Sequence, residues 1–449
     1  MNFLRLLRTT AVGIVLLLLL LVIVLWVKPP DLLRIGANYS AKIVCSNVFL
    51  AGRDPDVVLR TDVQAPGIAL LRLMRISVDR EHQVVRAGLL GFIGDGLAVA
   101  RPGTGCTVVP DGNLEFAPHD KAGATPPTAG PPPTDAPWPD GNAVKTTAAL
   151  DRVLTDDTLA GPGVRAIVVV DHGRIVAERY APGFSASTPL LGWSMTKSVV
   201  AGLVGLLIKD GVLSAEQLGF WSQSGDARAH IRIADLLAMS SGLSFNETHG
   251  LVSDLTRMLY LQPNMAAFAR AQPLLHPPGE FWSYSSGTAN ILARIVQDAA
   301  GELGAGYPKK SLFDPLGMTS ATMETDESGT LVGSSYMYAT ARDWARYGQF
   351  LLQQGVWQGR EMLPPGYVAM MATPVAASRG QYGHGLVWLD REAGDEIPAD
   401  CFWMEGHDGQ SIAIIPSRDL VLVRLGLTPA SDKYRPHPLV SAVLAALAQ

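Results

Sequence analysis

The sequence predicts an α+β fold in which one antiparallel sheet is flanked by helices and carries an all-helical insertion. Alternating apolar patterns with turn residues between them predict one strand hairpin over 165–181 and another over 410–427. Between the hairpins lie stretches with helical apolar spacing, among them 195–209 and 339–355. Because hairpins stand at both ends and helices between them, we expect one sheet built from both ends of residues 145–449.

An uncharged apolar run over 11–27 comes first along the chain. Its 17 residues would span about 25 Å as a helix, near the lower limit for crossing a bilayer. Trp26 and Lys28 stand where a cleavage site needs small residues, so we favour an uncleaved signal anchor over 1–30. A cleaved signal peptide is the alternative. Two arginines before the run favour a cytoplasmic N-terminus. We therefore expect a single-pass inner-membrane protein whose later residues lie in the periplasm or extracytoplasmic space.

Two segments separate this run from the main block. Over 31–117, short apolar stretches alternate with turn residues, which predicts a small N-terminal module with several strands. The segment 118–144 has seven prolines between positions 126 and 139. Such a composition cannot bury a core, so we expect a linker or a wrapping arm there. The chain then continues as one block over 145–449.

Three cysteines fit an exported chain. Cys45 and Cys106 flank the N-terminal module, and Cys401 lies near the other end. A Cys45–Cys106 disulfide is plausible in an oxidising compartment, with Cys401 free. Three unpaired buried thiols are the alternative.

Charge and composition exclude one class of partner. The 449 residues carry 41 acidic and 36 basic side chains, a net charge of −5. No long basic run occurs, which argues against nucleic acid, because its binding depends on clustered Lys and Arg. The nine histidines show no zinc signature, and we expect neither a metal nor a cofactor.

Ser194 and Lys197 form an S-x-x-K pattern at the start of the predicted helix over 195–209. Residues i and i+3 share one helix face, so the amine can reach the hydroxyl. The helix N-terminus favours a developing oxyanion, and a lysine with a lowered pKa can accept the serine proton. The pattern is weak alone, because a serine N-cap beside a snorkelling lysine would look the same.

Two further segments carry polar residues that could belong to a site. Residues 284–286 (Tyr-Ser-Ser) follow a Pro-Pro-Gly-Glu turn, and residues 407–410 (His-Asp-Gly-Gln) lead into the second hairpin. In isolation, ordinary core aromatics would explain the first segment, and a strand-entry turn would explain the second.

Together, the three elements resemble the serine β-lactamase and penicillin-recognising superfamily, whose motifs are S-x-x-K, Y-x-N and K-T-G or H-x-G. The resemblance covers about residues 145 to 449. It is nearest to the class C-like branch, with family VIII esterases, D-aminopeptidases and 6-aminohexanoate-oligomer hydrolases. Phrases such as GWSMTKSVVAGLVG, PPGEFWSYSSGTANILARIV and GHDGQSIAIIPSRDLVLVRLG carry it. It implies a β-lactamase-like fold, preceded here by the membrane helix and the N-terminal module.

The resemblance also implies roles for individual residues. Ser194 would be the nucleophile, Lys197 its base, and Tyr284 the proton relay toward the leaving group. The oxyanion hole would use the backbone N–H of Ser194 and that of Gln410, which follows Gly409 of the third motif.

Two departures from the family pattern bear on the substrate. Ser286 replaces the usual asparagine, and His407 stands where lactam-binding relatives have a lysine. An unperturbed histidine is only about a quarter protonated at pH 7, so a substrate carboxylate would seldom meet a cation there. These departures put antibiotic hydrolysis in doubt, while the acylation residues are complete.

The sequence therefore predicts a membrane-anchored, exported serine hydrolase that cleaves a small-molecule ester or small linear amide. The alternative is a non-catalytic protein of the same fold that binds penicillin or cell-wall peptides as a sensor. Retention of Ser194, Lys197 and Tyr284 together favours the enzyme.

Overall fold

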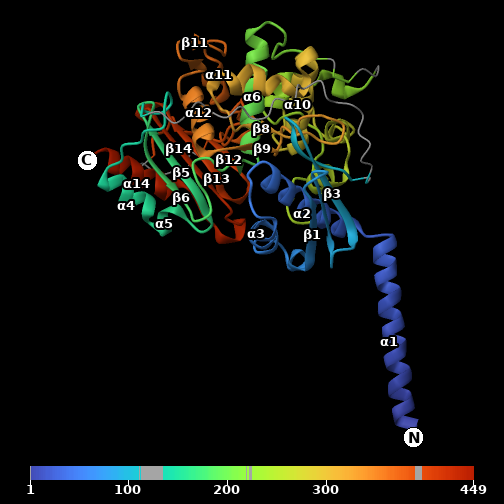
Figure 1. Ribbon diagram of the computed structural model, residues 1–449. Helices are drawn as coiled ribbons and strands as arrows, with labels where there is room; N and C mark the ends of the chain where they lie inside the picture. The colour runs from blue at the N-terminus through green and yellow to red at the C-terminus, as the bar shows by residue number, and fades with distance from the viewer. Residues whose placement is uncertain (1, 111, 113–134, 219, 222–224, 390–396) are drawn as a thin grey trace. The chain divides into compact units, whose positions relative to one another are not determined.

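The structure is a computed structural model that describes residues 2–110, 112, 135–218, 220–221, 225–389 and 397–449 (Figure 1). The chain divides into two compact units, each formed by segments that are distant in sequence. Unit 1 consists of Met1–Ala100, Cys106–Glu115 and Thr248–Pro263. Unit 2 consists of Arg101–Gly105, Phe116–Glu247 and Asn264–Gln449. Residues 248–263, which we expected within the main block, are thus part of unit 1.

Unit 1 begins with the apolar helix α1 (Asn2–Val27). Its segment Leu7–Val27 has a mean hydropathy of 3.1 and is long and apolar enough to cross a membrane. A signal sequence has the same properties, so the helix is a candidate for either. Pro29 and Pro30 separate it from the next helix, because proline cannot continue a helix from within.

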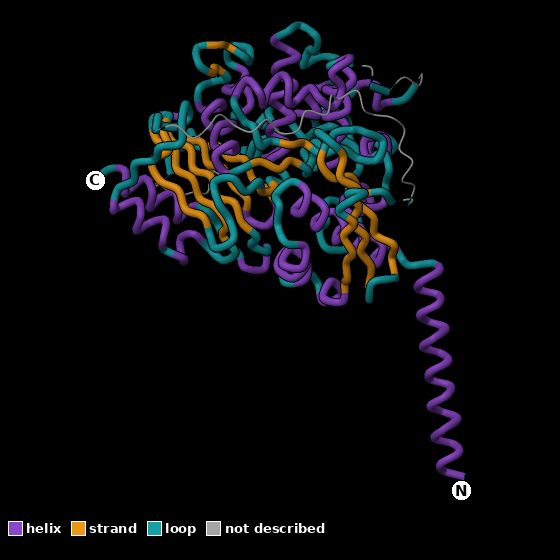
Figure 2. The backbone as a smooth tube through the Cα atoms, in the orientation of Figure 1, coloured by secondary structure: helices purple, strands orange, loops and turns teal. Residues whose placement is uncertain are grey.

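The rest of unit 1 is a helix packed on a four-stranded antiparallel sheet (Figure 2). The helix is α2 (Asp31–Phe49), and α8 (Asp254–Leu261) packs against it from the later segment. Asn38 of α2 joins the parts: its Nδ2 donates to Tyr260 O at 2.8 Å, and its Oδ1 accepts from Leu97 N at 3.1 Å. The remaining elements are α3 (Pro55–Val58), η1 (Leu59–Gln64), η2 (Ala69–Leu73), β1 (Met74–Asp79), β2 (Val84–Leu89), β3 (Ile93–Arg101) and β4 (Gly105–Val108).

One apolar stretch in this unit, residues 43–52, lies for the most part in α2, which ends at Phe49, where the alternating pattern suggested strands. The stretch is too short for the helical period of its apolar residues to be recognised in the sequence. Leu33, Ala37, Ala41, Val44 and Val48 are all buried, and their spacing of three and four residues places them on one face of α2. The module does contain the several strands that the later stretches indicated.

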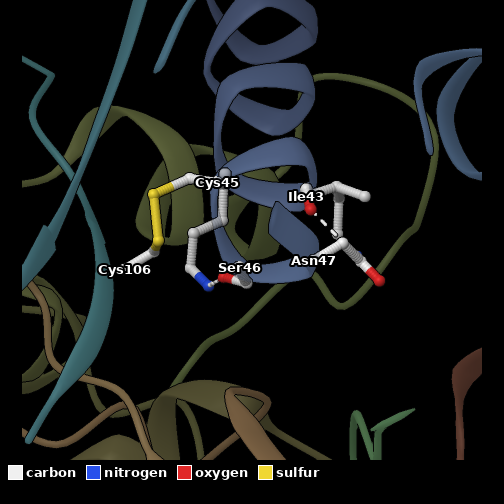
Figure 3. Close-up of a disulfide and its surroundings, with 6 residues drawn as sticks. Ile43, Cys45, Ser46, Asn47 and Cys106 are labelled. Carbon is white, nitrogen blue, oxygen red and sulfur yellow. Dashed lines mark hydrogen bonds between the residues drawn. A yellow bond between two sulfur atoms is a disulfide. The ribbon is translucent and has the colours of Figure 1, made fainter. Parts of the chain in front are cut away.

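Within unit 1, a disulfide between Cys45 and Cys106 links α2 to the strand β4 (Figure 3). The two cysteines are 61 positions apart, and their Cα atoms are separated by 6.0 Å. Cys401, in unit 2, is a buried thiol outside this disulfide.

Unit 2 contains the antiparallel sheet that the two hairpins predicted. Its strand order is β12-β13-β14-β5-β6, so the late strand β14 pairs with the early strand β5. His172 and Gly173 connect β5 to β6 with positive φ at both positions, as a tight type I′ hairpin requires. The strands are β5 (Val164–Asp171), β6 (Arg174–Tyr180), β12 (Phe402–Gly406), β13 (Gln410–Ile415) and β14 (Leu420–Gly426). The edge strand β12 was not foreseen from the sequence.

Helices cover both faces of this sheet (Figure 1). On one face, α4 (Ala148–Thr155) and α14 (His437–Leu447) bury a core that includes Leu150, Trp403 and Val443. On the other face α12 (Ala341–Leu352) packs against β14, β13 and β5. The helix α5 (Asp157–Ala160) precedes the first hairpin. The helices of unit 2 between the hairpins also include α6 (Met195–Lys209), α7 (Ile233–Leu237), α9 (Met265–Arg270), α10 (Ser286–Ala299), α11 (Asp314–Leu316) and α13 (Tyr367–Met371).

Smaller elements complete unit 2. One three-stranded sheet has the order β7-β9-β8, and β10 pairs with β11. Their bounds are β7 (Leu190–Leu191), β8 (Thr322–Met323), β9 (Met337–Ala339), β10 (Val356–Trp357) and β11 (Arg360–Glu361). Short helical turns occur at η3 (Ala227–His230), η4 (Gly301–Gly306), η5 (Lys309–Phe313), η6 (Ala376–Ser378), η7 (His407–Gly409), η8 (Pro416–Arg418) and η9 (Ala430–Asp432).

Most of the proline-rich segment expected over 118–144 lies outside the described residues. Its last part packs on unit 2: Trp138 is fully buried, with the guanidinium of Arg346 5.3 Å from its ring centre. Arg346 also donates to Pro139 O at 2.8 Å, and Arg174 donates to Trp138 O at 2.9 Å. This end of the segment is an arm rather than a free linker.

Candidate active site

A strand, a strained turn and a helix present Ser194. The strand is β7, and Gly192 follows it with its N–H bonded to Met337 O at 2.9 Å. A Cβ atom at Gly192 would lie 2.2 Å from the indole of Trp344, so only glycine fits there. Trp193 then adopts φ +47°, a left-handed conformation that is costly for a bulky residue. Ser194 comes next as the N-cap of α6, half-buried at the helix N-terminus.

Lys197 lies one turn into α6 with 1% of its surface exposed. Its Nζ is 2.9 Å from Ser194 Oγ, 3.1 Å from Ser286 Oγ and 2.8 Å from the backbone oxygen of Ser334. Together with Cε, these three neighbours complete the tetrahedral arrangement around an amine nitrogen. The structure thus brings the first two sequence motifs together at this atom.

Burial lowers the pKa of Lys197 to about 8, although the nearby carboxylate of Glu247 acts in the opposite direction. About one-tenth of the molecules would then carry a neutral amine at pH 7, and half at pH 8. A majority of neutral amine at pH 7 would have required a larger shift. The neutral fraction of the Lys197 amine therefore grows as the pH rises toward and past 8.

Tyr284 closes the site beside the lysine. Its ring centre is 4.9 Å from Lys197 Nζ, and the ring stacks on Trp388 at 5.3 Å and meets Tyr382 edge-on at 5.9 Å. Burial and the charge of Glu247 raise the pKa of Tyr284, while a hydrogen bond with Ser194 lowers it by a smaller amount. The phenol is thus neutral, and it lies against Ser194.

Ser286, the first residue of α10, is fully buried and contacts a residue that the sequence motifs did not include. Its backbone N–H and its hydroxyl both bond to the carboxylate of Glu247, at 2.8 Å and 2.5 Å. Glu247 ends the segment after α7 and precedes Ser286 by 39 positions. It carries a negative charge close to Lys197 and Tyr284.

The third motif lies next to the first. A Cβ atom at Gly406 would be 2.2 Å from Gly192 O, and the ring of His407 meets that of Trp193 edge-on at 5.6 Å. Burial lowers the pKa of His407 to about 4, although about a third of its side chain, 34%, remains exposed. The cation is therefore rarer at pH 7 than in an unperturbed histidine, because a ring packed against tryptophan loses the hydration that its charged form needs.

Gly409 and Gln410 hold the turn of the third motif in place. The Gln410 side chain bridges to Gly426 of β14, donating to its O at 2.7 Å and accepting from its N at 2.9 Å. Gly409 O accepts from the buried guanidinium of Arg424 at 2.8 Å. A Cβ atom at Gly409 would lie 2.7 Å from the same guanidinium. These contacts concern the Gln410 side chain and leave the role of its backbone N–H a prediction.

The sequence offered unequal clues to the residues that its motifs missed. Arg424 is the only charge in the apolar strand LVLVRLG, and a lone buried charge indicates a specific partner. Ser334 contributes a backbone oxygen, which no side-chain pattern can reveal. Glu247 is remote from Ser286 along the chain, so only the fold brings the two together.

No group of three or more His, Cys, Asp or Glu side chains gathers for a metal ion within the part of the chain that the structure describes. The side chains brought together at the site supply hydroxyls, an amine, a phenol, an imidazole and a carboxylate.

Comparison with known proteins supports the fold and its family. A family model described as Beta-lactamase matches residues 150–445. A 6-aminohexanoate-dimer hydrolase of Paenarthrobacter ureafaciens is 24% identical over 308 residues, covering 62% of this chain and 76% of that protein. A solved structure from Bacillus anthracis, assigned as a 6-aminohexanoate-dimer hydrolase, has a TM-score of 0.56 and 23% identity, covering 67% of this chain and 81% of its own.

A second solved structure, assigned as a β-lactamase of Bacteroides dorei, has a TM-score of 0.55 and 20% identity. It covers 67% of this chain and 99% of its own. At these identities the solved structures show the fold alone. The expected β-lactamase-like fold is confirmed.

Proposed function

The chain belongs to the β-lactamase family of hydrolases, and we propose that it cleaves an ester or a small linear amide through an acyl-enzyme on Ser194. One observation carries the proposal: Lys197 Nζ is 2.9 Å from Ser194 Oγ at the N-terminus of a helix, in a buried position that lowers its pKa. A nucleophile with an adjacent base of tuned pKa is the arrangement that covalent catalysis needs.

Acylation follows from these contacts. Ser194 Oγ attacks the substrate carbonyl carbon while its proton passes to the neutral amine of Lys197. The positive end of α6 lies at the oxyanion that forms. We assign the two oxyanion donors to the backbone N–H groups of Ser194 and Gln410. When the intermediate collapses, the bond to the leaving alcohol or amine breaks, and the leaving group takes a proton from the ammonium through Tyr284.

Deacylation reverses the roles. Water attacks the acyl carbon, its proton passes to the neutral lysine, and the bond to Ser194 Oγ breaks as that oxygen regains a proton. The products are a carboxylic acid and the free enzyme. Tyr284 suits the relay because its raised pKa keeps it protonated, while its hydrogen bond with Ser194 directs it to the reacting atoms.

The surroundings of the nucleophile favour substrates without a carboxylate next to the scissile bond. His407 is neutral above about pH 5, because burial lowers its pKa to about 4. The nearby Glu247 is an anion, which would repel a substrate carboxylate. The relative named as a 6-aminohexanoate-dimer hydrolase supports a linear amide. These arguments favour an ester or linear amide over a lactam antibiotic.

We further propose that α1 is an uncleaved anchor that holds the enzyme on the outer side of the inner membrane. Its 21-residue apolar segment, Leu7–Val27, supports this proposal. So does the disulfide of unit 1, because such bonds persist in oxidising compartments.

A substrate panel tests the function. Wild type and Ser194→Ala are assayed with p-nitrophenyl esters, linear 6-aminohexanoate oligomers, D-amino-acid amides and a chromogenic cephalosporin. We expect turnover of an ester or linear amide that disappears in Ser194→Ala. A stable Ser194 adduct without turnover would instead support the penicillin-binding sensor. The ratio of kcat/KM for a carboxylate-bearing ester to that for its methyl ester should be constant between about pH 5.5 and 8, since His407 does not titrate there.

A further inference from the structure

Four polar side chains form a continuous chain that ends outside the three motifs: Ser194, Lys197, Ser286 and Glu247. The consecutive distances are 2.9 Å, 3.1 Å and 2.5 Å. Lys197 and Ser286 are each 1% exposed, so water competes little for these bonds. The direction of the protons along the chain can therefore be worked out from the valence of each group.

The proton of Ser286 is assigned first. A carboxylate only accepts hydrogen bonds, and Glu247 is 2.5 Å from Ser286 Oγ, so the single hydroxyl proton of Ser286 lies between them. The second carboxylate oxygen accepts the backbone N–H of Ser286 at 2.8 Å, which fixes the carboxylate in place. Ser286 Oγ consequently presents only lone pairs to Lys197.

The amine of Lys197 is assigned next. The backbone oxygen of Ser334 also only accepts, at 2.8 Å from Nζ. A neutral amine has two protons and one lone pair, and it donates its two protons in hydrogen bonds to Ser286 Oγ and Ser334 O. The remaining position points at Ser194 Oγ, 2.9 Å away, and that position is the lone pair.

We propose that Glu247 is a positioning residue. It accepts the hydrogen bond of the Ser286 hydroxyl, so that Ser286 Oγ accepts a hydrogen bond from Lys197 and the lone pair of the amine faces Ser194. The inference rests on the proposed function, since it concerns the base of that reaction. It also explains how serine can replace the usual asparagine of the second motif. The oxygen of a carboxamide needs no partner to act as an acceptor, whereas a hydroxyl can rotate and becomes a defined acceptor only when another group holds its proton.

The other titratable groups described around α6 do not compete with Lys197 for the role of base. Tyr347 and Tyr367 donate to the backbone oxygens of Ser198 and Ala201 on α6, and burial raises the pKa of both phenols, so they remain neutral. Tyr284 faces Lys197 with a raised pKa, and Glu405 on β12 acts on Tyr284. Glu247 is the carboxylate that acts on Lys197 itself, and its charge raises the pKa of that amine.

Glu247→Gln tests the proposal in the full-length protein. The carboxamide oxygen would accept a hydrogen bond from the Ser286 N–H, and its NH₂ group would donate one to Ser286 Oγ. The Ser286 hydroxyl would then be free to donate its hydrogen bond to the lone pair of Lys197. We expect the plateau of kcat/KM for a neutral ester to fall by about 10²-fold, the scale for a misplaced catalytic group. The acidic limb of the pH profile should move to lower pH by about half a unit or more, because a negative charge beside Lys197 is lost.

Ser286→Ala supplies the second arm, because it removes the rotating hydroxyl. In the Ser286→Ala background, Glu247→Gln should hardly lower the plateau of kcat/KM any further, but it should still move the acidic limb to lower pH. Glu361→Gln, which removes a carboxylate paired with Lys209 at the far end of α6, is the matched control and should change neither quantity. Thermal unfolding of each variant separates misfolding from misplacement.

The proposal is overturned if Glu247→Gln keeps the wild-type plateau, or if it costs the same factor with and without the Ser286 hydroxyl. If Glu247→Gln does not fold, Ser286→Ala decides alone: its plateau should fall while its limb stays at the wild-type pH, and an unchanged plateau refutes the proposal. These results are distinct from failure of the proposed function, in which wild-type protein would show no Ser194-dependent turnover.

Discussion

Unit 1 and unit 2 each contain a buried lysine bonded to a serine on the same helix. In unit 1, Lys42 Nζ donates to Ser46 Oγ at 2.7 Å, one turn along α2. Ser46 follows Cys45, which forms the disulfide (Figure 3). In unit 2, Lys197 Nζ is 2.9 Å from Ser194 Oγ on α6. Both lysines are 1% exposed. A short lysine–serine hydrogen bond is therefore not by itself a catalytic signature.

The differences between the two pairs are in the hydroxyl and its surroundings. Ser46 is fully buried within α2, where no substrate can reach it. Ser194 is half-buried at a helix N-terminus, after a residue in a left-handed conformation, and beside a phenol. On the proposed mechanism, access, the helix dipole and a proton relay make the Ser194–Lys197 pair reactive, whereas the Ser46–Lys42 pair serves packing.

The largest contrast is expected for the two serines. Ser194→Ala should lower kcat by roughly 10⁴-fold or more, the scale for loss of a covalent nucleophile. Ser46→Ala should leave kcat unchanged and lower the unfolding temperature. Steady-state kinetics and labelling with a fluorophosphonate measure both, with the adduct expected on Ser194 only. Labelling that persists in Ser194→Ala would remove the distinction between the two pairs.

The lysines should differ next. Lys197→Arg and Lys197→Ala should each lose about 10³-fold in kcat/KM, because a guanidinium stays protonated and cannot act as a base. Lys42→Arg should leave kcat/KM at the wild-type value, measured on the same ester. A largely active Lys197→Arg would mean that positive charge suffices and that another group is the base.

A pH profile sharpens the comparison through the lowered pKa of Lys197, about 8. In the proposed mechanism the neutral amine is the base, so kcat/KM for a neutral ester should rise with pH and level off above about pH 9. Between pH 6 and pH 9 the neutral fraction grows roughly 90-fold, and the rate should follow. A profile that falls over this range would contradict a lysine base. Ser194→Ala provides the correction for spontaneous hydrolysis.

The smallest effect on activity is expected from the disulfide beside the unit 1 pair. Cys45→Ser should leave kcat/KM unchanged while lowering the free energy of unfolding by about 4 kcal/mol, the chain-entropy value for a loop of this length. Urea unfolding followed by fluorescence measures the loss. Cys401→Ser is the control, since that thiol has no covalent partner. Three alkylatable thiols in wild-type protein purified without reductant would contradict the bond.

Local patterns were sufficient for much of unit 2. The turn at residues 172 and 173 and the apolar strands around it predicted β5 and β6, and the helix expected over 195–209 has the observed bounds of α6. The N-terminal stretch over 43–52 was harder, because a helix that is buried on most sides shows no clear helical period in a short stretch of sequence.

The candidate site divides in the same way. The motifs locate Ser194, Lys197, Tyr284 and Ser286, which lie close together, since their order and spacing reflect the fold. They could not reveal Glu247, whose contact with Ser286 spans 39 positions, nor the backbone oxygen of Ser334. The charge state of His407 also depends on its tertiary contact with Trp193, which spacing does not encode.

The assignment of α8 to unit 1 has a consequence for the order in which the chain folds. Proteins are synthesised from the N-terminus, and domains commonly fold as they emerge. Here α2 must wait for residues 254–261 before Asn38 finds its partner at Tyr260 and the side chains of Met258 and Leu259 are buried. More than half of the chain must therefore be made before the first unit is complete. A gene cut after the proline-rich segment would yield two fragments, of which the first lacks a helix and the second exposes one.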